Sequence, residues 1–178
     1  IMGGSQGAQV INDVIYNLLD FLNDKNFRIV HILGDTLDPK FNNKKNKNYI
    51  PIAFTNEIAA LMQNCDLVIS RAGSGAINEI IKTKSPSILI PYPNAKNNHQ
   101  EKNALILSSI GCSIMIEQNK NLEINLKKNL QRIFNIESNN TENQNKILDI
   151  MKNNISEFNL KDPRKEIKRI INCYKKNL

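Results

Sequence analysis

The sequence contains no tryptophan, and its aromatic residues are limited to four tyrosines and six phenylalanines. These few aromatics are not interleaved with the basic residues as stacking platforms, so we do not expect nucleic acid as a partner. The sequence also shows no run of about eighteen apolar residues and no leader with charged, apolar and small-residue parts. Neither a membrane-spanning helix nor a signal peptide is therefore expected.

Cysteine is scarce as well. Cys65, Cys112 and Cys173 are odd in number, far apart and embedded in apolar patterns. This arrangement favours reduced thiols over disulfide bonds, and it does not predict a metal site.

The charge that is in excess is positive. The sequence has 24 Lys and Arg residues against 17 Asp and Glu residues, which gives a formal net charge of +7. Such a balance suggests an anionic partner, which leaves an anionic membrane face or a phosphorylated substrate once nucleic acid is ranked low. The length of 178 residues fits one domain.

The most informative stretch runs from Leu67 to Glu79. It opens with a short apolar run typical of a buried strand, continues into a loop with Gly73, Ser74 and Gly75, and ends in apolar residues at helical spacing. A helix N-terminus offers unpaired N–H groups and roughly half a unit of positive charge, and glycines let a phosphate approach them. Arg71 adds a cation, and Glu79 is placed to accept both hydroxyls of a ribose. We interpret the stretch as a nucleotide site.

A plain turn is the competing interpretation, because Gly and Ser are ordinary loop formers. The loop lacks the third glycine of the dinucleotide fingerprint, and no Gly-Lys-Ser/Thr motif occurs. A second glycine loop at residues 3–7 favours the nucleotide. It follows Ile1-Met2, which we interpret as the end of a strand whose beginning is missing, so the chain is expected to start inside a larger protein. Ser5 in this loop suits phosphate binding and helix capping equally well.

Strands and helices alternate through most of the chain. We predict an α/β fold with a Rossmann-like, doubly wound parallel sheet and a ligand crevice at the carboxyl ends of its strands. Further strands are predicted at 27–33, 49–54, 87–90 and 111–116, and helices at 8–21, after Thr55, after Asn98, and at 122–134, 141–155 and 162–174. The helix at 8–21 is predicted to share one buried face among Val10, Ile11, Val14, Ile15, Leu18 and Leu19.

Several polar or aromatic residues fall at the predicted strand ends. Phe54 and Thr55 are a candidate platform for a base, although core packing of Phe54 and helix capping by Thr55 are the plainer interpretations. His31 is expected to be a satisfied structural residue. A group of side chains that suit a hydroxyl-rich ligand follows the strand at 87–90, with helix capping by Asn98 as the alternative: Asn98, His99, Gln100 and Asn103.

The C-terminal part is helical and basic. We predict a domain over residues 1–158, followed by an amphipathic helix within 159–178 whose polar side carries Lys and Arg. Docking of this helix on its own domain is favoured over an anionic membrane.

The motifs together resemble the C-terminal half of the MurG-type peptidoglycan N-acetylglucosaminyltransferases. The likeness follows the right order over about the first two-thirds of the chain. The motifs are Gly3-Gly4-Ser5-Gln6-Gly7-Ala8, Phe54 with Ala59, Arg71-Ala-Gly-Ser74 with Glu79, Pro86, and Asn98-His-Gln100 with Asn103-Ala104.

The resemblance implies the donor-binding half of a two-domain GT-B glycosyltransferase. That family transfers GlcNAc with inversion from UDP-GlcNAc to a muramyl-pentapeptide carried on undecaprenyl pyrophosphate, at the cytoplasmic membrane face, with no tightly bound metal and no cofactor. By position, Ser5 and the backbone from Gly73 to Ala76 would hold the diphosphate. Thr55 would hold the uracil, Glu79 the ribose and Gln100 the sugar. The remaining substrate-binding positions implied are Gly4, Gln6, Phe54, Arg71, His99 and Asn103.

Two departures limit what this chain is expected to do. His31-Ile-Leu-Gly34 differs from the His-Gln-x-Gly that is more usual there. The N-terminal half, with the acceptor site and the presumed base, is missing, so the resemblance places no catalytic residue in this chain and predicts no transfer by the chain alone. Other GT-B enzymes, such as a UDP-GlcNAc epimerase or a glycolipid synthase, and a binding subunit that needs a separate partner stay open as alternatives.

Overall fold

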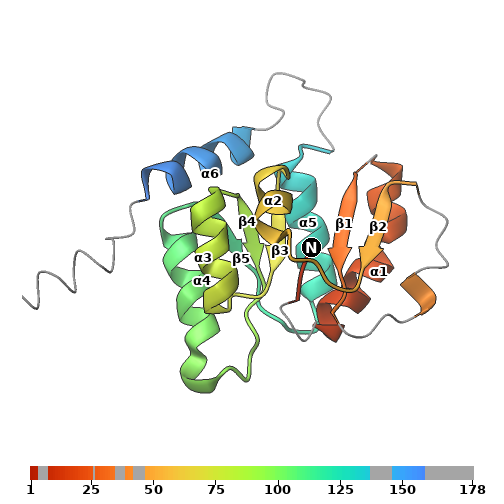
Figure 1. The fold of residues 1–178 in the computed structure, drawn as a ribbon, viewed down its shortest axis with the longest axis horizontal. Helices are drawn as coiled ribbons and strands as arrows, with labels where there is room; N and C mark the ends of the chain where they lie inside the picture. The colour runs from red at the N-terminus through yellow and green to blue at the C-terminus, as the bar shows by residue number, and fades with distance from the viewer. Residues whose placement is uncertain (4–7, 26, 35–38, 42–46, 137–145, 159–178) are drawn as a thin grey trace, which may run out of the picture.

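The computed structural model describes residues 1–3, 8–25, 27–34, 39–41, 47–136 and 146–158. Helices alternate with short strands along these residues (Figure 1). In chain order the elements are α1 (Gln9–Asp24), β1 (Ile29–Ile32), η1 (Pro39–Phe41), β2 (Tyr49–Ile52), α2 (Ile58–Gln63), β3 (Val68–Ser70), α3 (Ser74–Thr83), β4 (Ser87–Leu89), η2 (Lys96–Asn98), α4 (His99–Ser109), β5 (Ser113–Met115), α5 (Leu122–Ile133) and α6 (Lys146–Glu157).

All the strands run parallel. β1 pairs with β2, and β4 lies between β3 and β5. Met2 joins these two groups, because it forms parallel bridges with Ile32 at the end of β1 and with Ser70 at the end of β3. The order across the sheet is therefore β2, β1, Met2, β3, β4, β5. The predicted strand end at Ile1-Met2 thus occupies the centre of the sheet, and Pro51 lies on the edge strand β2, where a missing N–H is tolerated.

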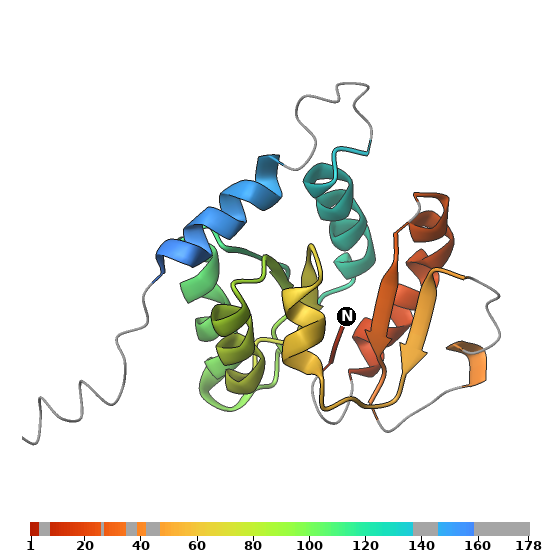
Figure 2. The ribbon, with the colours of Figure 1, turned by 45° about the horizontal axis from the view of Figure 1, so that its top comes forward.

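Each face of the sheet has its own core. Along β4 the side chains alternate, so that Ile88 belongs to one apolar cluster and Leu89 to the other. Helices α1 and α5 cover the first face, and α2, α3 and α4 cover the second (Figures 1 and 2). Helix α6 contributes Leu148 to the first cluster and Ile155 to the second. This is the predicted doubly wound α/β arrangement.

The buried stripe of α1 differs from the predicted one. Val10 is 41% exposed, whereas Asn12 and Leu22 are buried. The stripe centres on Ile11, Ile15 and Leu22, and Val10 lies outside it because successive residues turn by about 100° around a helix. The prediction for Val10 was wrong, and the buried Asn12 is a polar member of the stripe that periodicity could not find.

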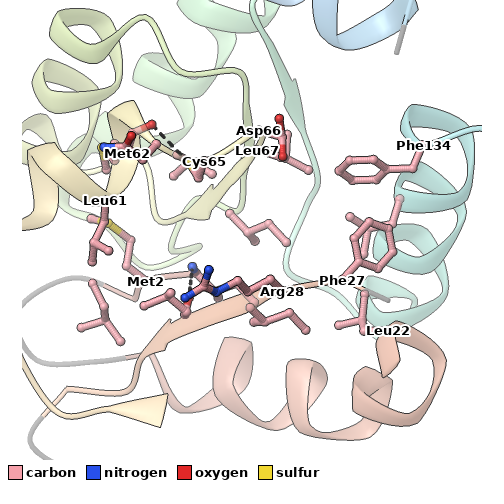
Figure 3. Close-up of a pocket in the computed structure, with 18 of the residues that line it drawn as sticks. Met2, Leu22, Phe27, Arg28, Leu61, Met62, Cys65, Asp66, Leu67 and Phe134 are labelled. Carbon is pink, nitrogen blue, oxygen red and sulfur yellow. Dashed lines mark hydrogen bonds between the residues drawn. The ribbon is translucent and has the colours of Figure 1, made fainter. Parts of the chain in front are cut away.

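A cavity of 830 Å³ lies between the amino-terminal ends of β1 and β3 (Figure 3). Phe27 and Arg28 line it on one side, and Asp66 and Leu67 on the other. In the described part of the chain, only Ile1 and Met2 connect these two strands by backbone hydrogen bonds. The cavity is therefore at the opposite end of the sheet from the loops that follow the strands. No helix among the described residues has the length and apolar character needed to cross a membrane.

Candidate functional site

The order of the strands places a switch point beside Met2. From Met2 the chain continues through α1 to β1 and β2 on one side, and it then crosses to β3, β4 and β5 on the other. In open α/β sheets the ligand crevice lies at the carboxyl ends of the strands, at such a point. The loop after β3 lies at this end of the sheet. Of the predicted residues, Gly4, Ser5 and Gln6 lie outside the described residues.

The amino-terminal end of α3 is open. Gly73 is its N-cap, in extended conformation, and no side chain caps the helix. The N–H group of Ile77 is bonded to the carbonyl of Gly73, but the N–H groups of Ser74, Gly75 and Ala76 precede that first helical bond. A Cβ atom added at Gly73 or Gly75 would meet no atom within 4 Å. N–H donors without a partner among the described residues, the helix dipole and the open space together suit an anion.

Glu79 lies on the second turn of the same helix. Its carboxylate Oε1 is 3.7 Å from Nζ of Lys82, and its side chain is 34% exposed. Lys82 is itself 72% exposed, so water screens this pair and the carboxylate remains available as an acceptor. The spacing along α3 places the Glu79 carboxylate one turn from the N–H groups of Ser74, Gly75 and Ala76.

Arg71 is almost fully buried, at 8% exposure. Its Nη1 donates to the carbonyls of Ile90 (3.1 Å) and Pro91 (3.2 Å), and its Nη2 donates to Oε1 of Gln118 (2.5 Å). Burial lowers the pKa of the guanidinium from its ordinary value. The cation expected beside the α3 loop is thus bonded to the chain that leaves β4 and β5.

The residues after β2 differ from the plainer interpretations. Phe54 is 64% exposed, so core packing of this ring was wrong. Thr55 is not the N-cap, because α2 begins at Ile58 after Glu57. The Thr55 hydroxyl instead accepts a hydrogen bond from the N–H of Glu57 (3.0 Å) and so fixes a turn before the helix. An exposed ring at the carboxyl end of a strand is available to stack on a base.

The start of α4 is attached to the neighbouring loops at two points. The N–H of Tyr92 donates to Oε1 of Gln100 (3.0 Å), and Nδ2 of Asn103 donates to the carbonyl of Ala72 (3.0 Å). His99 is exposed and its Nδ1 lies 2.7 Å from the carbonyl of Lys96. Asn98 holds the N-cap position without a side-chain cap bond, so capping by its side chain is not observed.

Two further residues of this region were not predicted from the sequence. Tyr92 lies with its ring centroid 5.5 Å from Cζ of Arg71, and Gln118 accepts from the same guanidinium. Neither stands in a motif, and only the sheet brings them to Arg71. The described residues hold no group of three or more His, Cys, Asp or Glu side chains placed to bind a metal ion.

The chain resembles known proteins over most of its length. The family described as Glycosyltransferase family 28 C-terminal domain matches residues 1–158. A relative from Prochlorococcus marinus strain MIT 9312, named UDP-N-acetylglucosamine–N-acetylmuramyl-(pentapeptide) pyrophosphoryl-undecaprenol N-acetylglucosamine transferase, is 54% identical over 99% of this chain and 48% of its own length. A relative of the same name from strain NATL2A is 42% identical over 73% of this chain and 39% of its own.

Solved structures have the same fold. The crystal structure of MurG from Acinetobacter baumannii has a TM-score of 0.73 at 20% identity and covers 96% of this chain and 50% of that one. The glycosyltransferase SnogD from Streptomyces nogalater has a TM-score of 0.57 at 16% identity and covers 88% of this chain and 38% of that one. The predicted fold class and the family resemblance are confirmed. The chain spans about half the length of the curated relatives it matches.

Proposed function

Because the chain belongs to the glycosyltransferase family 28 C-terminal domain, we propose that it binds the nucleotide sugar for an inverting N-acetylglucosaminyltransferase. The donor is UDP-GlcNAc, and the acceptor is a lipid-linked muramyl-pentapeptide. The names of the relatives support this choice of donor and acceptor. Residues 1–158 are proposed as the donor domain, with the basic segment 159–178 as its C-terminal extension.

The observation that carries the proposal is the geometry of α3. At its N-terminus the N–H groups of Ser74, Gly75 and Ala76 have no partner in the part of the chain that the structure describes, and Glu79 is one turn further along. In the proposal the N–H groups of Ser74, Gly75 and Ala76 bind the diphosphate, and Glu79 accepts the two ribose hydroxyls. Gly4, Ser5 and Gln6 follow the central strand position at Met2, so we assign them to the same diphosphate.

The base and the sugar are assigned to flanking loops. Phe54, with 64% exposure, stacks on the uracil, and the backbone at Thr55 reads its edge. Gln100, supported by Asn103 and His99 at the start of α4, binds the hydroxyls of the sugar. These assignments place base, diphosphate and sugar in sequence along the carboxyl edge of the sheet.

The proposed chemistry is electrostatic. As the bond between the sugar and the diphosphate breaks, negative charge develops on the leaving UDP. Preorganised N–H groups and the positive end of α3 stabilise this charge. In known enzymes, loss of one such donor raises the activation free energy by about 3 to 4 kcal/mol. The acceptor site and the general base are proposed to lie outside residues 1–178. The net charge of +7 suits contact with an anionic membrane that carries the lipid-linked acceptor.

Calorimetric titration of the 178-residue chain tests the proposal. We expect UDP and UDP-GlcNAc to bind, and ATP and NAD to bind more weakly or not at all. Replacing Glu79 by Ala removes an acceptor for two hydroxyls, so the free energy of UDP binding should become less favourable by about 1 to 3 kcal/mol.

Glu157→Ala is the matched control, because Glu157 is exposed at the end of α6 and away from the crevice. This variant removes the same charge and should bind UDP as the unchanged chain does. Preferred binding of ATP or NAD, or equal effects of the two substitutions, would contradict the proposal.

A further inference from the structure

We propose that Arg71 is a positioning residue that acts through Tyr92 on Gln100 and so sets the preference for the sugar of the donor. The inference rests on the proposed function, since it takes Gln100 as the residue that meets the sugar. It assigns Arg71 a task other than binding phosphate, and it follows from contacts between segments far apart in the chain.

The guanidinium of Arg71 holds the exit of β4. It donates to two consecutive carbonyls, those of Ile90 and Pro91, and it reaches across to Gln118 beyond β5. These three bonds are made by a side chain that is only 8% exposed. A planar fork with several donors suits such a divergent set of acceptors, and a lysine could not reproduce it.

Tyr92 is the residue that this arrangement fixes. Its ring lies over the guanidinium, with 5.5 Å between ring centroid and Cζ, although 45% of the residue is exposed. Packing alone therefore restrains Tyr92 weakly. The bonds of Arg71 to the two preceding carbonyls restrain the backbone that leads to Tyr92, and the cation–π contact restrains its ring.

The backbone of Tyr92 in turn orients the Gln100 side chain. An N–H group can donate only to the amide oxygen, so the bond to Oε1 fixes which end of the amide faces Tyr92. The Nε2 group of Gln100 then faces away with its two donors, and no acceptor within the described part of the chain is bonded to it. A sugar hydroxyl or carbonyl is the ligand chemistry that fits these donors.

A second contact supports the same unit. The carbonyl of Ala72, the residue next to Arg71, accepts from Nδ2 of Asn103 one turn further along α4. The two consecutive residues after β3 thus hold both the loop before α4 and the helix itself. In the proposed function the diphosphate binds the N–H groups of Ser74, Gly75 and Ala76 and not the Arg71 side chain, so loss of that side chain should separate sugar binding from UDP binding.

The test compares Arg71→Met, which keeps the apolar stem, with Arg71→Lys and with the unchanged 178-residue chain. We expect Arg71→Met to lower the affinity for UDP-GlcNAc by about tenfold, which is the loss expected for one hydrogen bond to the sugar. The affinity for UDP should change by no more than about twofold. Arg71→Lys should restore part of the preference. Arg132→Met, an exposed position on α5, is the matched control and should change neither affinity.

Amide hydrogen exchange at Tyr92 provides a readout that needs no ligand. Arg71→Met should speed this exchange by about fivefold or more, because the restraint on the Tyr92 N–H is lost. If Arg71→Met does not fold, Gln118→Leu and Tyr92→Ala remove one contact each. Both should lower the affinity for UDP-GlcNAc relative to the affinity for UDP.

Unchanged exchange at Tyr92, or equal losses of UDP and UDP-GlcNAc affinity, would overturn the assignment of Arg71. A chain that binds neither nucleotide would instead contradict the proposed function, and the exchange measurement would still decide whether Arg71 fixes Tyr92.

Discussion

Nε2 of His31 lies 3.0 Å from Oδ1 of Asn12, between β1 and α1. Nδ2 of Asn12 donates to the carbonyl of Leu33 (3.0 Å), so its Oδ1 must accept and His31 carries its proton on Nε2. Nδ1 of His31 then accepts from the hydroxyl of Tyr49 (2.9 Å). A neutral imidazole with its proton on Nε2 thus has a partner at each ring nitrogen, which confirms the structural role expected for His31.

The network predicts a pH dependence of stability. Burial lowers the pKa of His31 to about 3, whereas an unfolded histidine has its pKa near the ordinary 6.5. Between these values the unfolded state binds the proton and the folded state does not. The free energy of unfolding should therefore fall as the pH is lowered from 6.5, with a slope that approaches about 1.4 kcal/mol per pH unit from this group.

Urea unfolding at several pH values between 8 and 5 measures this slope. His31→Gln should be less stable at pH 8 but should lose the part of the slope that His31 causes. His99→Gln is the control, because His99 is exposed. The same slope in the His31→Gln variant as in the unchanged chain would refute the prediction.

Replacement by alanine should affect folding at one of two glycines and not at the other. Gly111 has a φ of +72°, and a Cβ atom there would lie 2.6 Å from Nδ2 of Asn154, which donates to the Gly111 carbonyl. Gly111→Ala should therefore cost about 1 to 3 kcal/mol in the free energy of unfolding. Gly75→Ala meets no neighbour and should leave stability nearly unchanged, yet weaken UDP binding. Chemical unfolding of both variants, with calorimetry on Gly75→Ala, checks the contrast.

Two buried serines are expected to lower stability. Ser87 and Ser113 are direct partners across β4 and β5, and neither hydroxyl has a hydrogen-bond partner among the described residues. A buried polar group without a partner costs free energy. Ser87→Ala and Ser113→Ala should thus raise the free energy of unfolding, each by about 1 kcal/mol. Ser109→Ala on the exposed side of α4 is the control, and a loss of stability in both buried variants would contradict the argument.

Phe54 should matter for binding and not for folding. With 64% of the residue exposed, Phe54→Ala removes little buried area, and the melting temperature should change by no more than about 2 °C. If the ring stacks on uracil, UDP affinity should fall by about 1 kcal/mol or more. Val10→Ala, another exposed apolar position, should change neither quantity. A large loss of stability in Phe54→Ala would point to a core role instead.

Local patterns accounted for the α/β architecture and for the α3 loop. A buried strand, a glycine loop and an amphipathic helix are each specified by neighbours within a few residues, so the order of strand, loop and helix from Leu67 to Glu79 could be predicted without a structure. The predicted helix at 122–134 likewise matches α5, whereas the helix predicted at 162–174 lies outside the described residues. The location of Gln100 and Asn103 at the start of the same helix could also be predicted from the sequence.

Contacts across the sheet could not be predicted in this way. The three acceptors of Arg71 lie 19, 20 and 47 positions away along the chain. The neighbouring residues in the sequence therefore suggested only a cation that binds phosphate, whereas in the fold the guanidinium is bonded to the segments that follow β4 and β5. The exposure of Phe54 and the burial of Asn12 depend likewise on which elements pack nearby. The sequence by itself determined the order of strands, loops and helices and the family, because periodicity and motifs are local. Only the tertiary structure decided the partners of Arg71, Tyr92 and His31, because parallel pairing joins segments that periodicity cannot relate.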